Sequence, residues 1–157
     1  MTDVEPVQRA VLHALELAKE NLEHWCGDLT AEELNARPGG VASVGFHLRH
    51  IPGSMDRLLT YAEGKSLTNE QIAVMKQETE PAGGASALLS GLRNGIESAS
   101  ARIRAFPSST LSEPRTVGRQ LMPTTVAGLL VHVADHTQRH AGQAVTTAKI
   151  VKGNRQV

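Results

Sequence analysis

The chain has 157 residues, with 16 acidic and 16 basic side chains, seven histidines and one cysteine. This length predicts a single domain over residues 1–157, large enough to bury a core without disulfides. The balanced charge gives no reason to expect a nucleic-acid or membrane partner. The single cysteine, the polar start and the lack of any run near the roughly 20 apolar residues of a membrane span favour a soluble, cytoplasmic protein.

Apolar residues spaced three and four apart predict four long amphipathic helices. The first runs from about Val4 to Trp25 and ends at Gly27. The second follows Ser43, a favoured N-cap residue, and ends before Gly64, a favoured residue just past a helix. The first two long helices are therefore delimited by recognisable start and stop residues.

Shorter elements connect these helices. Thr30, with Glu33 three residues later, predicts a short capped helix before the Pro-Gly-Gly break at 38–40. A short amphipathic piece is expected near 68–77, before the breakers at 81–84. We expect both pieces to lie outside the four long helices.

The third long helix is expected at about 88–103, stopping before Pro107. The stretch 107–123 is rich in Ser, Thr, Pro and Gly and has no period, which predicts a loop with a short extended piece around Val117.

The fourth long helix is expected to open at Met122 or Thr124 and to run to about Lys149. Four helices of roughly 20 to 28 residues, with almost no β signal, predict an all-α four-helix bundle.

Three histidines four residues apart, His132, His136 and His140, lie in the fourth predicted helix. Residues at i and i+4 are about 40° apart around a helix, so two neighbours in the row can reach one bound atom. Gln143 shares the direction of the row and would add a hydrogen-bonding group beside it. Imidazole is a common ligand of zinc and nickel, so the row indicates a metal site.

A second helix has to complete such a site, and its candidates are His47 and His50. On an ideal helix His47 lies about 60° from the centre of the apolar face and His50 about 120° away, which favours His47. However, Pro52 removes the hydrogen bond to the Leu48 carbonyl and bends the helix near His50. The pattern alone therefore leaves both histidines open.

Two stretches carry a family resemblance: SVGFHLRHIPGSMDRLLTY and, about 70 residues later, LLVHVADHTQRHAGQ. Together they resemble the DinB superfamily, also called the DinB/YfiT-like metalloenzymes. The resemblance implies a four-helix bundle with a long crossover connection. It also implies a metal site formed by His50, His136 and His140, with zinc or nickel as the ion.

The remaining candidates would then be neighbours of that site. The resemblance places His47 and His132 outside the metal-binding triad, and we assign them, with Gln143, to its second layer or to the cleft. The chain departs from the family pattern at Ala141, where arginine is common, and at Pro52, where a helix former is usual. Neither departure removes a ligand.

Some relatives are thiol-dependent transferases or isomerases, so the resemblance implies a metal-dependent enzyme of the S-transferase type, with a metal-dependent hydrolase as the other enzymatic candidate. Its three-histidine site would activate a thiol or water, and its substrate would be a small molecule, with a low-molecular-weight thiol as one candidate. The alternative function is a non-enzymatic bundle that binds a metal or a small molecule, or serves as a dimer module. We also expect a homodimer, because small helical bundles often bury an exposed apolar stripe against a second copy.

The sequence also excludes several other kinds of site. It contains no Glu-x-x-His of di-iron carboxylate bundles and no His-Glu-x-x-His of zinc proteases. Glycine-rich phosphate loops and dinucleotide fingerprints are missing as well. Cys26 is predicted to be an inert core thiol, as free cysteines usually are.

Overall fold

The computed structural model describes residues 4–156. Within them the α-helices are α1 (Pro6–Cys26), α2 (Ala31–Asn35), α3 (Val44–Ala62), α4 (Asn69–Gln77), α5 (Ala85–Ala105) and α6 (Val126–Gly153). The strands β1 (Pro114–Val117) and β2 (Met122–Thr125) pair as an antiparallel hairpin. Short 3-10 turns lie at Pro38–Gly40, Ser108–Thr110 and Asn154–Gln156.

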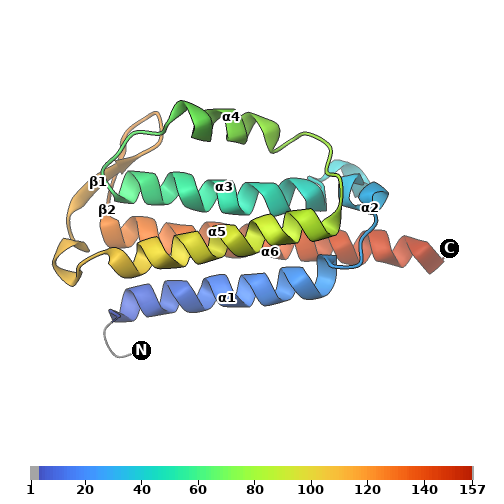
Figure 1. The fold of residues 1–157 in the computed structure, drawn as a ribbon, viewed down its shortest axis with the longest axis horizontal. Helices are drawn as coiled ribbons and strands as arrows, with labels where there is room; N and C mark the ends of the chain where they lie inside the picture. The colour runs from blue at the N-terminus through green and yellow to red at the C-terminus, as the bar shows by residue number, and fades with distance from the viewer. Residues whose placement is uncertain (1–3, 157) are drawn as a thin grey trace.

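The four long helices α1, α3, α5 and α6 lie side by side (Figure 1). Both α1 and α3 pack against α5 and against α6. Helices α3 and α5 run in the same direction, so the connection that carries α4 returns along the length of the molecule (Figure 1). The all-α prediction is confirmed. None of the described helices combines the length and the apolar character that a membrane crossing requires.

The hydrophobic core lies between the four long helices. Its side chains recur at three- and four-residue spacing on each helix, as the amphipathic pattern predicts. Burying one such side chain stabilises the fold by about 1.5–3 kcal/mol. The apolar rows therefore determine how each helix is rotated and which of its polar residues face a neighbour. The largest fully buried side chains are Leu15, Leu22, Leu34, Val44, Leu48, Ile51, Met55, Leu59, Leu92, Ile103, Leu129 and Leu130.

Helix α3 continues through Pro52 without a break. Proline lacks the N–H that would bond the carbonyl of Leu48, and its ring stands out from the helix surface. Helix α5 meets this ring with Gly95, where an added Cβ would lie 2.5 Å from the Cβ of Pro52. The absence of a side chain at Gly95 thus allows α3 and α5 to approach at this point.

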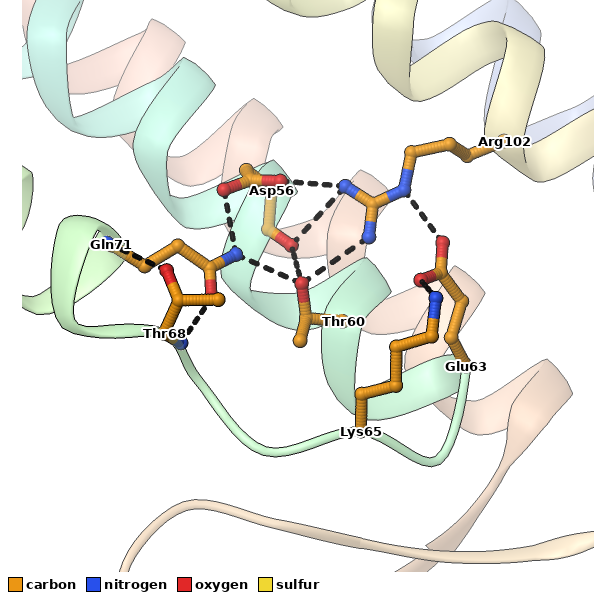
Figure 2. Close-up of polar contacts among 7 residues, drawn as sticks. All are labelled: Asp56, Thr60, Glu63, Lys65, Thr68, Gln71 and Arg102. Carbon is orange, nitrogen blue, oxygen red and sulfur yellow. Dashed lines mark hydrogen bonds and ion pairs between the residues drawn. The ribbon is translucent and has the colours of Figure 1, made fainter.

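Helix α4 contains no buried residue and is held to the long helices partly by polar contacts. The amide of Gln71 donates to Asp56 Oδ2 at 2.7 Å and to Thr60 Oγ1 at 2.8 Å. The guanidinium of Arg102 on α5 donates to the same two residues and to Glu63 (Figure 2). These contacts join the second half of α3 to α4 and α5.

The short extended piece expected around Val117 is present as β1, whereas β2 and the start of α6 differ from the expectation. The loop predicted at 107–123 contains β1, and β2 extends to Thr125, so α6 begins at Val126 instead of at 122 or 124. The side chain of Thr125 accepts the N–H of Gly128 and caps the helix. Pro123 lies in β2, where a two-stranded sheet has a free edge that tolerates a missing N–H.

Candidate metal centre

Four histidine rings meet between α3 and α6. His47 and His50 come from α3, and His136 and His140 come from α6. The ring centroids of His50 and His140 are 4.4 Å apart, and those of His136 and His140 are 4.5 Å apart. One ligand atom from each of His50, His136 and His140 lies within 4.8 Å of the other two, a group that could hold a metal ion. The structure thus brings together the three histidines that the family resemblance singled out.

Local structure explains how α6 supplies two of these rings. His136 and His140 are one helical turn apart, so both project from the same side of α6. Val133, Thr137 and Ala141 are buried beside them and pack this side of α6 toward the core. Both histidines therefore lie at the edge of the core, half-buried and facing α3.

His50 is held from both sides of its ring. Its Nδ1 lies 2.7 Å from Oε2 of Glu78, and its Nε2 lies 2.9 Å from Nε2 of His136. An ionised carboxylate can only accept a hydrogen bond, so Nδ1 carries the proton and Nε2 carries the lone pair. Two imidazole nitrogens at this distance either share one proton or direct two lone pairs at one cation. The donor set therefore fits a divalent ion.

His47 contacts the same group from deeper in the core. Its side chain is 3% exposed, and its Nδ1 lies 2.9 Å from Nδ1 of His140. The helical pattern correctly predicted that His47 faces inward. The group that could hold a metal ion nevertheless contains the less buried His50, whose ligand atom lies within 4.8 Å of those of His136 and His140.

The electrostatic surroundings keep most of these rings neutral. Burial, together with the smaller effect of neighbouring imidazoles, lowers the pKa of His47, His136 and His140 to about 4 each. A neutral imidazole offers a lone pair to a metal, whereas a protonated one does not. At neutral pH His47, His136 and His140 are therefore in the form that binds a cation.

Phe46 lies against the histidines on the α3 side. Its ring is stacked on that of His50, with centroids 5.1 Å apart and an interplanar angle of 16°. It also meets His47 and His140 edge to face. This packing restricts the rotation of the rings and gives the centre an apolar wall.

Glu78 and Arg57 are the residues that the sequence reasoning missed. Glu78 is 4% exposed and Arg57 9% exposed, and Oε1 of Glu78 lies 2.6 Å from Nη1 of Arg57. Burial disfavours the ionised Glu78 carboxyl, but hydrogen bonds from His50 and Arg57 outweigh it and hold the pKa of this carboxyl below its usual range. In the sequence, Glu78 follows a short amphipathic piece in a polar segment, which gives no signal of burial.

The other predicted neighbours are less closely associated with the cluster. His132 is exposed, and its ring centroid is 5.7 Å from that of His136. Gln143 is exposed on α6. Gln138 of α6 is turned toward α1, where its amide donates to the carbonyl of Ala14.

A cavity of about 800 Å³ lies beneath α4, against α3 and α5. Apolar side chains such as Leu48, Val74 and Leu88 line it together with Glu78, and no histidine of the described chain does. Glu78, which also contacts Nδ1 of His50, is therefore the residue that the cavity shares with the surroundings of the histidine cluster.

Helical proteins often hold a metal ion with side chains from two facing helices. The converging imidazoles of α3 and α6 place this protein in that class. The sequence model of the DinB superfamily matches residues 14–144, which include all four clustered histidines. The chain belongs to that superfamily. A search of the curated proteins found no match.

Proposed function

We propose that this protein binds one divalent metal ion through His50, His136 and His140, and that the ion is zinc or nickel. The observation that carries the proposal is the convergence of three ligand atoms, all within 4.8 Å of one another, from two helices. Neutral imidazoles suit both ions. Three such ligands are also typical of catalytic zinc sites, which keep a position open for water or substrate.

The chemistry that fits this centre is the transfer of a thiol to a small electrophile. Three neutral ligands leave the ion its full charge, which would lower the pKa of a thiol or water at its open position. The thiol would release its proton to solvent, its sulfur could form a bond to an electrophilic carbon, and the leaving group would depart with the electron pair of the broken bond. We therefore propose a metal-dependent enzyme of the S-transferase type.

The thiol has to come from a substrate. Cys26 is the only cysteine of the chain and is fully buried at the end of α1. Burial raises the pKa of its thiol to about 11, so it stays protonated near neutral pH. A low-molecular-weight thiol is the substrate class that meets this requirement.

Elemental analysis of protein purified without a histidine tag tests the metal site. We expect about one zinc or nickel ion per chain in the wild type, and little or none in His136→Ala and His140→Ala, because each variant loses one of three ligands. His13→Ala removes an exposed histidine of α1 and should keep the wild-type metal content. A wild type that holds no zinc or nickel, even after the ions are added, would contradict the proposal.

A second measurement tests the enzymatic part of the proposal. The same samples are incubated with small thiols and electrophiles, and the rate at which the thiol is joined to the electrophile is measured. We expect activity in the metal-loaded wild type and its loss in His136→Ala. Full metal occupancy without turnover across these substrates would reject the enzymatic part and leave a metal-binding helical protein.

A further inference from the structure

Glu78 is a buried carboxylate with one partner for each oxygen. It lies one residue beyond α4 and reaches toward α3. Its Oε2 accepts a hydrogen bond from Nδ1 of His50 at 2.7 Å, and its Oε1 pairs with Nη1 of Arg57 at 2.6 Å. The chain Arg57, Glu78, His50 therefore ends at Nε2 of His50, the atom that faces His136.

A gap in the side-chain surface of α3 makes room for this pair. Gly53 lies one turn before Arg57, and a Cβ at Gly53 would lie 2.6 Å from Oε1 of Glu78 and 3.0 Å from Nη1 of Arg57. Any other residue at this position would displace the ion pair. The pair is thus fitted closely against the backbone of α3.

The backbone around Glu78 is also held by α3. The guanidinium of Arg49 donates to carbonyls on both sides of Glu78, those of Gln77, Glu80 and Pro81. The backbone that carries the Glu78 carboxylate is therefore bonded to Arg49 on both sides of Glu78.

From this geometry we infer that Glu78 is the positioning residue for His50, and that Arg57 holds Glu78 in place. The inference rests on the proposed binding of a metal by His50. A carboxylate that accepts from Nδ1 keeps the lone pair on Nε2, orients the ring and makes it a stronger ligand. Arg57 balances the charge of the carboxylate, which would otherwise be buried alone.

The test compares zinc affinity, measured by competition with a chromophoric chelator, in the wild type and two charge-removing variants. Glu78→Gln keeps the shape of the side chain but loses its charge, and we expect zinc binding to weaken roughly 10- to 100-fold. Glu80→Gln removes the same charge from an exposed side chain two residues later and should bind zinc as the wild type does.

Two further measurements separate positioning from stability. The absorption spectrum of bound Co²⁺ reports ligand geometry, and we expect it to change in Glu78→Gln. Glu78→Gln also leaves the charge of Arg57 buried alone, so the double variant Arg57→Met/Glu78→Gln restores the charge balance. In the double variant we expect thermal stability to recover and zinc affinity to stay low.

The outcomes separate this inference from the proposed function. If the wild type binds none of zinc, nickel and cobalt, both the proposed function and the inference are wrong. If the wild type binds tightly and Glu78→Gln binds equally well with an unchanged cobalt spectrum, only the role of Glu78 is wrong. Recovery of zinc affinity in the double variant would also overturn it, because Glu78 would then act only through stability.

Discussion

His47 and His50 stand three residues apart on α3 yet have different surroundings. His47 is buried and pairs with His140, whereas His50 lies between Glu78 and His136. A helical wheel measures distance from the apolar face, so it ranks burial and contains no information about the partner of a side chain. This is why the pattern favoured His47 although the ligand group contains His50.

Cys26 is the clearest case in which burial determines the chemistry of one residue. Its folded-state pKa of about 11 lies above the ordinary value of 9.0, so in the native protein the thiolate forms only in strongly alkaline solution. We expect iodoacetamide to label native protein at pH 8 at least about tenfold more slowly than protein unfolded in denaturant. Mass spectrometry over a time course measures both rates. Equal rates would show that the Cys26 thiol is accessible and reactive in the native protein, and Cys26 would then be a candidate nucleophile.

At the scale of elements, the contact between α3 and α5 depends on two special residues. The ring of Pro52 projects from α3, and Gly95 of α5 leaves the space that it occupies. We expect Gly95→Ala to lower the free energy of unfolding by about 1–3 kcal/mol, because the new methyl group would overlap Pro52. Urea unfolding followed by circular dichroism measures the change.

Gly91 provides a matched control on the same helix. An added Cβ there meets no atom within 4 Å, so Gly91→Ala only improves helix propensity. It should raise the free energy of unfolding by about 0.5–1 kcal/mol. If both variants change the free energy of unfolding in the same direction and by similar amounts, the contact between Gly95 and Pro52 does not explain the result for Gly95→Ala.

Several element boundaries could be predicted from local sequence. The side chains of Thr30, Ser43 and Thr68 cap α2, α3 and α4, because capping depends on residues three apart. An extended piece around Val117 could be predicted, but its pairing with β2 could not. The two short strands are polar and half-exposed, and their pairing depends on the partner strand and not on periodicity.

At the scale of the whole molecule, the apolar core is larger than the candidate metal centre and extends over all four long helices. The fully buried apolar side chains of the four long helices lie between those helices, and the half-buried His50, His136 and His140 lie at the edge of this core. We expect metal-free protein to stay folded and helical. Binding stabilises the folded state by RT ln(1 + [L]/Kd), about 2.7 kcal/mol at a free ion concentration of 100 Kd.

Thermal unfolding with a chelator and with added zinc measures this difference. The melting temperature of the wild type should rise with zinc, and that of His140→Ala should not. Loss of the helical signal on chelation alone would contradict the prediction and would make the metal part of the fold.

The sequence by itself determined the long helices, most of their ends and the spacing of the histidine row, because these follow from periodicity and from capping within a few residues. Family resemblance added the pairing of His50 with His136 and His140. Only the tertiary structure decided which groups surround those rings. Glu78 is 28 residues from His50 and reaches it because α4 returns along the molecule, and His47 meets His140 across 93 residues because α3 packs on α6. Such contacts depend on how helices are placed in space, which no local pattern of residues encodes.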